Sequence, residues 1–250
     1  MNLLEVLKIN MDMTRRQVLR AGAALGFVLS TLLPFKAGKA SGKKITGEEE
    51  AMNLKAPLPD GSVSVERAIK QRRTVRSFMD RPVSVQQFSQ ILWAGQGITQ
   101  DRGFKRAAPS GGALYPMDLY ASIGVNSVVG MEEGVYHYEP RDHSVQKIAE
   151  GDWRRDVAVA SLNQMWMADA AMLIIVTAEY NRITIKYGKR GIRYALIESG
   201  CIGQNIFLQS QGLGLEAGIV GAFKDREVAN LLGIEKTREP LIILPVGWPG

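Results

Sequence analysis

Residues 171–178 read AMLIIVTA, an almost unbroken run of apolar side chains with one threonine near its end. A segment this short, rich in β-branched residues and lacking alternating polar positions, is typical of a strand buried on both faces. We therefore expect it to lie in a sheet that carries helices, and the remaining segments must be assigned to that sheet or to those helices.

Apolar runs on both sides of this segment predict further strands. They are residues 119–123, 134–138, 145–148, 215–220 and 241–246. The turn-forming residues 140–143 join two of these runs in what resembles a hairpin. Helices are expected between the strands, two of them capped by serines. The expected helices are residues 64–72 after the Ser64 cap, a segment that begins at Ser84, and residues 152–162, 192–211 and 225–232. Because strands and helices follow no regular alternation, we predict an α+β fold with a mostly antiparallel central sheet flanked by helices.

Composition and charge narrow the classes of function. The chain has 250 residues, of which 46% are hydrophobic and 22% are charged, as in ordinary globular proteins. Residues 41–62 are rich in Lys, Glu, Gly and Pro and are expected to be a linker, which leaves 63–250 as the folded domain. The formal net charge is +6, and residues 1–40, with six basic and two acidic groups, account for +4 of it. A nucleic-acid partner is therefore not expected.

Cysteine and histidine are scarce in this chain. A single cysteine, Cys201, permits no disulfide within the chain and no thiolate cluster, and we expect no metal site. The two histidines are His137 and His143. Their spacing supports no Ser-His relay, although such a relay is left open.

The N-terminal residues have the layout of an export signal. Residues 13–33 read MTRRQVLRAGAALGFVLSTLL, in which the Arg15-Arg16 pair precedes a weakly hydrophobic run, and residues 36–40 (KAGKA) end in small residues. The apolar run is short for a membrane span, which needs about 20 residues. The pattern resembles a twin-arginine signal, so we expect residues 1–40 to engage the export machinery and the protein to be periplasmic or extracytoplasmic. The alternative is an uncleaved leader that anchors the protein to the membrane.

The helix expected at residues 192–211 has almost no polar face. A helix that is apolar all round is buried inside a large core or between subunits. Gly200 and Gly203 weaken such a helix and are tolerated where another backbone approaches closely. We expect this long buried helix to lie at a homodimer interface.

Three short segments are candidates for ligand binding. Residues 72–76 (RRTVR, the arginine segment) form either a solvated charged helix end or a cradle for phosphate oxygens. Residues 106–116 (RAAPSGGALYP, the serine–glycine loop) form either a tight turn or a loop whose backbone N–H groups face a ligand. Residues 212–223 (GLGLEAGIVGAF) form either a strand with glycine-rich ends or a second backbone surface for a flat ligand.

The order of these segments is more specific than any one of them. The arginine segment, the serine–glycine loop, the apolar helix, GLGLEAGIVGAF and a terminal LPVGWPG together resemble the FMN-dependent nitroreductase superfamily over residues 63–249. Within it, SGGALYP and residues 186–205 (KYGKRGIRYALIESGCIGQN) resemble the SagB-type branch of thiazoline/oxazoline (azoline) dehydrogenases. The resemblance implies a nitroreductase-like fold, a homodimer and FMN as the cofactor.

The resemblance also implies a role for individual residues. The phosphate and ribityl end of FMN would be held by Arg72, Arg73 and Thr74. The pyrimidine edge would face Arg76, with Asn163 as a weaker candidate. FMN would be contacted, from the partner subunit, by Pro109, Ser110, Gly111 and Gly112. A backbone N–H for flavin N5 would come from Val220 and Gly221.

The activity implied is that of a flavoenzyme. A reductant such as NADPH would pass a hydride to flavin N5, and a small organic acceptor would then take the electrons in a ping-pong cycle. In the azoline branch Lys186 and Tyr187 would be catalytic, since a desolvated lysine can act as a base. Otherwise they are exposed residues at a helix start. The alternatives are therefore an azoline dehydrogenase and a non-catalytic flavin-binding or electron-transfer protein.

Overall fold

The computed structural model describes residues 51–100 and 105–250, which belong to one compact unit. The expected export signal, residues 1–40, and the first part of the expected linker lie outside the described residues. Among the described residues, no helix combines the length and the apolar character that a membrane crossing requires.

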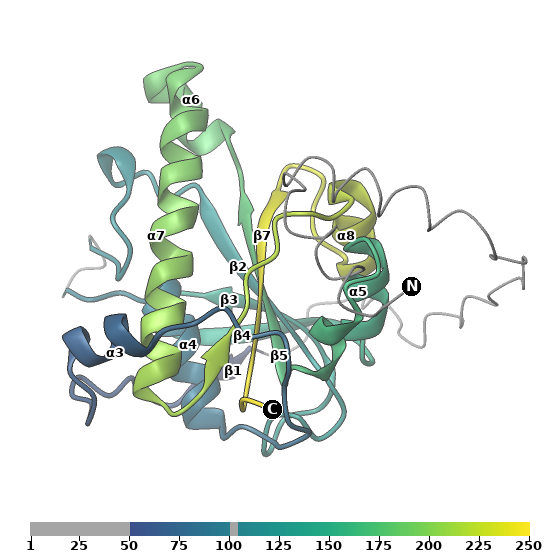
Figure 1. The fold of residues 1–250 in the computed structure, drawn as a ribbon. Helices are drawn as coiled ribbons and strands as arrows, with labels where there is room; N and C mark the ends of the chain where they lie inside the picture. Colours follow the sequence, from purple (N-terminus) through teal and green to yellow (C-terminus); the bar gives the residue numbers. More distant parts are fainter. Residues whose placement is uncertain (1–50, 101–104) are drawn as a thin grey trace, which may run out of the picture. The chain divides into compact units, whose positions relative to one another are not determined.

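The described residues form a seven-stranded sheet in the order β1-β4-β3-β2-β5-β7-β6 (Figure 1). Its strands are β1 (Met52–Asn53), β2 (Met117–Ile123), β3 (Gly134–Glu139), β4 (Ser144–Glu150), β5 (Met172–Ala178), β6 (Glu216–Ala217) and β7 (Glu239–Gly247). Every strand pair in the sheet is antiparallel. The structure confirms the predicted α+β class and the hairpin of β3 and β4.

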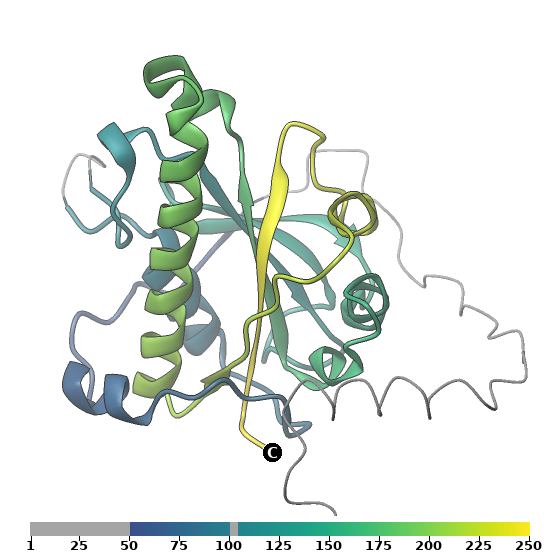
Figure 2. The ribbon, with the colours of Figure 1, turned by 45° about the horizontal axis from the view of Figure 1, so that its top comes forward.

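Helices cover both faces of the sheet (Figures 1 and 2). They are α3 (Val65–Gln71), α4 (Val85–Gln96), α5 (Arg154–Ala160), α6 (Asn181–Tyr187), α7 (Arg190–Gly212) and α8 (Asp225–Leu232), with two short 3₁₀ turns, η1 (Gly111–Ala113) and η2 (Met165–Asp169). The long helix α7 runs with α3 and α4 along one face, and α5 and α8 lie on the other.

Strand β5 is buried on both faces, as its sequence predicts. All seven of its residues are buried. Ile174 and Val176 belong to the core that α4 and α7 close, whereas Leu173 and Ile175 belong to the core that α5 and α8 close. Successive side chains of a strand point to opposite faces, so an unbroken apolar run supplies both cores at once.

The two predicted serine caps are present. The Ser64 hydroxyl accepts a hydrogen bond from the Arg67 N–H at the start of α3. At α4, Ser84 accepts from the Gln87 N–H and the Gln87 side chain reaches back to the Ser84 N–H, which completes a capping box. Both helices therefore begin where the sequence places them.

The sequence predicts one strand over residues 215–220, but the structure interrupts it. Only Glu216–Ala217 forms β6, and Val220 makes a separate bridge to Ile243. Gly218 lies between them and donates its N–H to the Pro245 carbonyl. A side chain at Gly218 would lie 2.8 Å from the Val75 carbonyl oxygen. This crossing of two backbones interrupts the strand.

Part of the expected linker packs on the folded unit. Met52 and Asn53 form β1 against β4, and the Leu54 N–H donates to the His143 carbonyl. The His143 Nε2 lies 2.8 Å from the Ser89 hydroxyl and 2.9 Å from the Lys55 carbonyl oxygen, and burial lowers the pKa of His143. Ser89 is completely buried, so this Ser-His contact fastens the segment to α4 and does not expose a nucleophile.

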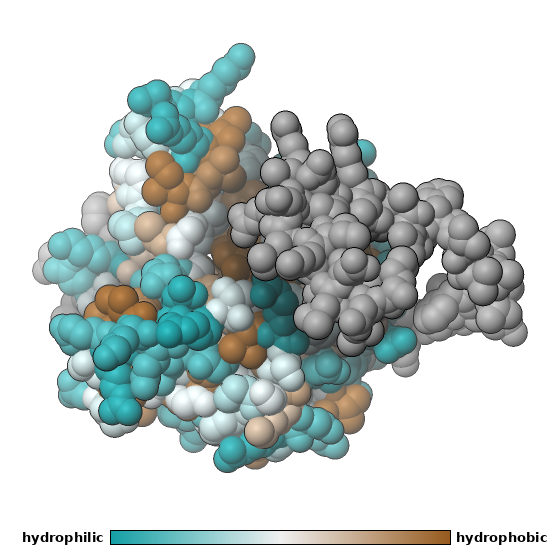
Figure 3. Space-filling model, viewed as in Figure 1, coloured by the Kyte–Doolittle hydropathy of each residue, from teal (hydrophilic) through white to brown (hydrophobic). Residues whose placement is uncertain are grey.

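One side of α7 presents apolar side chains to solvent. Ala195, Ile202 and Ile206 are fully buried against the sheet. In contrast, Leu196 and Ile197 are 50% and 57% exposed. Figure 3 shows hydrophobic surface along the upper part of α7. The described residues therefore cover only one side of this helix.

The capping box gives the first testable prediction. Replacing Ser84 with Ala removes an acceptor from the first turn of α4 and should lower the free energy of unfolding by about 1 kcal/mol. Thermal denaturation checks this, with Ser62→Ala as the control because Ser62 is an exposed serine outside any helix. Equal melting temperatures for the two variants would contradict the cap.

Candidate functional site

The arginine segment follows directly on α3. Arg72 ends this helix, and its guanidinium lies 5.2 Å from the centroid of the Phe207 ring on α7. The Arg73 guanidinium donates to the Lys70 and Arg72 carbonyls at 2.9 and 2.8 Å and remains exposed. Thr74 forms a bridge to Ala217, which places the arginine segment beside the glycine-rich segment 212–223.

A tryptophan that the sequence analysis did not consider joins these two segments. The Arg76 guanidinium lies 5.8 Å from the centroid of the Trp166 ring, within the range of a cation–π contact. A side chain at Gly218 would come within 2.8 Å of the same ring. Asn163 lies three residues before Trp166, exposed and with a positive φ of 60°. The structure thus brings Arg76 and Gly218 together at Trp166, whereas no contact joins the exposed Asn163 to them among the described residues.

The backbone of the glycine-rich segment requires one correction. Val220 was expected to offer its N–H to a ligand, but this N–H donates to the Ile243 carbonyl at 2.8 Å and the side chain is buried. Gly221 is exposed, and a side chain there would meet nothing within 4 Å. No hydrogen bond of the Gly221 N–H is found among residues 51–100 and 105–250. Of the two, Gly221 is the available donor.

The serine–glycine loop closes on itself through Ser110. The Ser110 hydroxyl accepts a hydrogen bond from the Tyr115 N–H at 2.9 Å, around the 3₁₀ turn η1. Gly112 lies in the left-handed region with φ 64° and ψ 19°. Pro109 and Gly112 are exposed, so this loop presents backbone to its surroundings.

The serine–glycine loop meets the candidate catalytic pair. A side chain at Gly112 would lie 2.7 Å from the Tyr187 hydroxyl and 3.0 Å from the Lys186 Nζ. Tyr187 also packs edge-on against Tyr194, with ring centroids 5.1 Å apart. Gly112 is therefore a neighbour of Lys186 and Tyr187, although more than seventy positions in the chain separate it from them.

A half-buried ion-pair cluster fixes α6, which carries this pair. The Arg182 guanidinium contacts Asp118 at 3.0 Å and Glu179 at 2.7 Å, and Arg238 contacts Asp118 at 2.8 Å. Burial alone would raise the pKa of Asp118, but the neighbouring His137, the hydrogen bond from Arg182 and the charges of Arg182 and Arg238 lower it overall. Asp118 therefore remains ionised and ties β2 to the first turn of α6.

Polar residues of α7 lie against the serine–glycine loop. The Asn205 amide donates to the Ala94 and Ala107 carbonyls, each at 3.1 Å. Glu198 accepts from the Gln96 amide at 3.4 Å, and the Arg106 guanidinium of the loop donates to the same Gln96 side chain at 3.0 Å. A side chain at Gly111 would lie 3.6 Å from the Tyr194 Cβ. Sequence reasoning took this helix as apolar and missed Glu198 and Asn205. Their spacing of seven residues, which places both on one stripe, was the available signal.

The candidate residues form two groups at different heights on α7. The serine–glycine loop contacts Tyr194, whereas the arginine segment contacts Phe207. At 1.5 Å per residue, these thirteen positions separate the two groups by about 20 Å. The structure therefore does not bring Gly112, Lys186 and Tyr187 together with Arg72–Arg76 and Gly221 in one chain.

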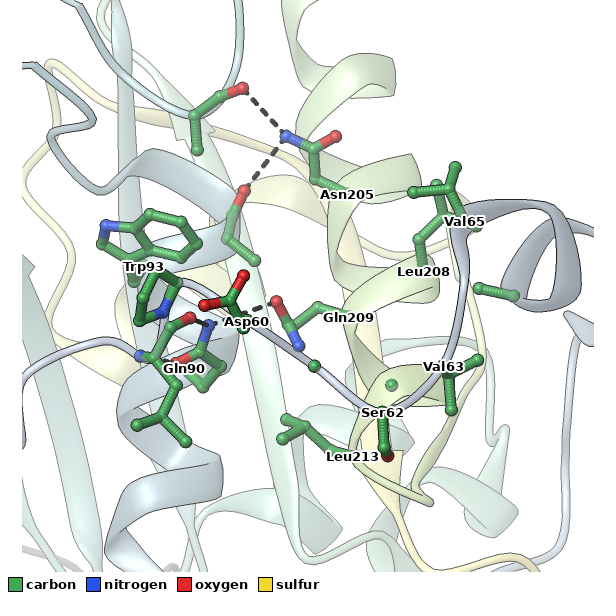
Figure 4. Close-up of a pocket in the computed structure, with 17 residues that line it drawn as sticks. Asp60, Ser62, Val63, Val65, Gln90, Trp93, Asn205, Leu208, Gln209 and Leu213 are labelled. Atoms are coloured by element: carbon green, nitrogen blue, oxygen red, sulfur yellow. Dashed lines mark hydrogen bonds between the residues drawn. The ribbon is translucent and has the colours of Figure 1, made fainter.

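A separate cleft contains none of the predicted site residues. It has a volume of about 480 Å³ and lies between residues 58–65, α4 and α7 (Figure 4). Trp93, Leu208 and Asp60 line it, and Asn205 borders it with its two hydrogen bonds to the backbone. A second cleft of about 490 Å³ lies at the arginine segment and is lined by Lys70, Arg73 and Glu216 among others. The described residues contain no cluster of three or more potential metal ligands.

Comparisons with a family model and with known proteins point to the same family. The model of the nitroreductase family matches residues 69–248. A nitroreductase-named protein of Methanocaldococcus jannaschii, MJ1384, is 40% identical over 195 residues, which cover 78% of this chain and 96% of that protein. The microcin B17-processing protein McbC of Escherichia coli is 25% identical over 174 residues, covering 67% of this chain and 63% of McbC.

Solved structures agree on the fold. A nitroreductase-type protein from Ralstonia eutropha superposes with a TM-score of 0.69 at 21% identity, covering 83% of this chain and 93% of that one. The NADPH:FMN oxidoreductase of Vibrio harveyi, solved with NAD+, superposes with a TM-score of 0.53 at 21% identity, covering 74% and 68%. At these identities the structures support the fold alone.

The contact at Gly112 gives the second testable prediction. Replacing Gly112 with Ala should lower the free energy of unfolding by about 1 kcal/mol for the left-handed backbone, and further because the methyl group must displace Tyr187 and Lys186. Gly130→Ala is the matched control, since Gly130 also has a positive φ of 79° but open space around it. A melting temperature for Gly112→Ala no lower than that of Gly130→Ala would contradict the contact.

Proposed function

This chain belongs to the nitroreductase family, and we propose that it is an exported FMN-dependent oxidoreductase. In this proposal a reductant such as NADPH delivers a hydride to the flavin and leaves, and a small organic acceptor then takes the electrons. The family supplies the oxidoreductase class. FMN, the donor and export are the proposed refinements, and FMN and NADPH are the pair named for the Vibrio harveyi oxidoreductase that shares this fold.

The observation that carries the proposal is the division of the site into two groups on α7. Each group is incomplete: one offers cations and the free Gly221 N–H, and the other offers the serine–glycine loop with Lys186 and Tyr187. A homodimer packed through the exposed apolar side of α7 would bring the loop of one copy to the arginine segment of the other. The exposed Leu196 and Ile197 support this contact because burying them on association is favourable.

The residues present fit FMN. Lys70 and Arg73 line the cleft of about 490 Å³ and form no ion pair among the described residues, so both charges are available to a phosphate. Gly221 is exposed, and a side chain there would meet nothing within 4 Å, so its backbone is open to a ligand. The flavin supplies the redox chemistry when bound, and the chain supplies binding, orientation and the shelter that a closed dimer gives from water.

A second function is favoured by a specific contact. Lys186 and Tyr187 lie against Gly112 of the loop that would contact the flavin, where a lysine could hold or move a proton. The 25% identity to McbC supports an azoline dehydrogenase of SagB type as the alternative. A non-catalytic flavin-binding or electron-transfer protein would instead need the arginine segment alone.

Flavin binding is the third testable prediction. The purified protein should show the visible absorption spectrum of a flavin, and NADPH added without oxygen should bleach it. Arg73→Ala should weaken FMN binding at least tenfold, because it removes a charge-assisted hydrogen bond worth about 1.5–3 kcal/mol. Arg141→Ala is the control, since Arg141 lies exposed in the turn between β3 and β4. A colourless protein that takes up no FMN would rule out the proposed cofactor.

Lys186 separates the two enzyme functions and gives the fourth prediction. For an NADPH-driven oxidoreductase, Lys186→Ala should retain FMN and change turnover less than tenfold. For an azoline dehydrogenase, turnover of a thiazoline substrate should fall by more than a hundredfold while FMN stays bound, since general base catalysis contributes typically 10²–10⁴-fold. Lys189→Ala is the matched control on the same exposed tip. Absorbance of the flavin and steady-state rates provide both readouts.

A further inference from the structure

Glu198 is a buried carboxyl group that the proposed chemistry does not yet use. It lies on α7 beneath the serine–glycine loop and is only 2% exposed. No ion pair of Glu198 is found in the described part of the chain. A carboxylate that is removed from water without a paired cation is strongly disfavoured, so the question is what this group gains from its position.

Few groups stabilise the ionised form of Glu198. From α4, the Gln96 amide donates to Glu198 Oε1 at 3.4 Å, and the Ser110 hydroxyl of the loop is near enough to lower the pKa of the carboxyl group. Glu198 Oε2 has no hydrogen-bond partner among the described residues. Among those residues, the charge that acts on Glu198 is Arg106, whose guanidinium donates to Gln96 Oε1 at 3.0 Å and lies 4.4 Å from the centroid of the Tyr115 ring.

Burial therefore dominates the titration of this group. It raises the pKa of Glu198 to about 7, against smaller opposing effects of Ser110, Gln96 and Arg106. A carboxyl that titrates near neutral pH responds to a change of charge in its surroundings. This response reaches the loop through Gln96, whose amide donates to Glu198 and whose Oε1 accepts from Arg106, the first residue of the loop.

The path from Glu198 to the candidate catalytic pair is short. The Gln96 amide donates to Glu198, the Gln96 Oε1 accepts from Arg106 at the start of the loop, and further along the loop Gly112 packs on Tyr187 and Lys186. When Glu198 is ionised, its negative charge attracts Arg106. When Glu198 is protonated, that attraction is lost and the carboxyl group becomes a hydrogen-bond donor. The protonation state of Glu198 thus changes the electrostatics at the base of the loop.

We propose that Glu198 is a positioning residue that takes up a proton from solvent when the redox site beside the serine–glycine loop gains negative charge. This inference rests on the proposed function, since it needs the flavin to lie at that loop. Two electrons arriving with one hydride leave the site more negative, and the proton bound by Glu198 offsets that charge. The carboxyl group exchanges its proton with solvent and is neither oxidised nor reduced.

The first test concerns the carboxyl group itself and needs no flavin. The folded protein keeps the Glu198 proton up to about pH 7, whereas the ordinary value for glutamate is 4.5. Between these pH values the folded state binds more protons than the unfolded state, so stability falls as pH rises and stays low above pH 7. The folding equilibrium constant should fall on the order of 100-fold across this window relative to Glu198→Gln.

The second test measures the coupling to the redox site. In the FMN-loaded protein, the midpoint potential of the flavin is followed against pH from 5.5 to 8.5. The protein should bind up to one more proton per two electrons than Glu198→Gln. Its midpoint potential should therefore fall more steeply with pH, by as much as about 30 mV per pH unit, which is a tenfold change in the equilibrium constant of a two-electron couple. Glu227→Gln, an exposed glutamate of α8, should leave the slope unchanged. A merely structural glutamate would shift the potential without changing its slope.

The outcomes separate the two proposals. Equal slopes in the protein and Glu198→Gln would overturn the redox coupling, and equal pH dependence of stability would overturn the titration of Glu198. A chain that folds, shows the Glu198-dependent stability and binds no FMN would overturn the proposed function and the coupling together, while leaving the buried titrating carboxyl established.

Discussion

The constraint on which this structure depends is that β5 has no exposed face. Its apolar side chains alternate between two cores, so the sheet is stable only when helices cover both of its sides. The single polar side chain in the strand obeys the same constraint: Thr177 is fully buried and donates its hydroxyl to the Asp118 carbonyl at 3.5 Å. The layer of α5 and α8 and the layer of α3, α4 and α7 follow from this one strand.

Helix α7 connects that constraint to the candidate site. Its inner side closes the core with Ile202 and Ile206, and Asn205 donates to the Ala107 carbonyl of the serine–glycine loop. A polar group that is removed from water is stabilised only by specific partners, which makes it a stronger determinant of one conformation than another leucine would be. The apolar residues of α7 thus place the helix, and Asn205 helps to place the loop.

Most of the fold could be predicted from the sequence, whereas much of the site could not. The β5 run and the serine caps are local patterns, and each one specifies its own element. The end of β6 depends on the approach of the Val75 backbone to Gly218, which no local pattern contains. The N–H of Val220 was assigned to a ligand because the sequence does not reveal its partner, the Ile243 carbonyl. Glu198 could not be predicted as functional for a similar reason. One charge in an apolar helix stands out only when the structure shows that no cation pairs with it.

The proposed dimer gives a physical reason for the length of α7 and for one of its glycines. The two groups of candidate residues contact this helix at Tyr194 and Phe207, and the midpoint between these positions falls at Gly200. A two-fold axis near that point would place the upper group of one copy beside the lower group of the other, and the reverse. Gly203 is buried, and a side chain there would lie 3.2 Å from Ile242 of its own chain, so its small size serves the sheet. Gly200 is exposed with open space beside it, as a close crossing of two helices requires. The same helix would then assemble two equivalent sites, each built from the arginine segment of one copy and the serine–glycine loop of the other.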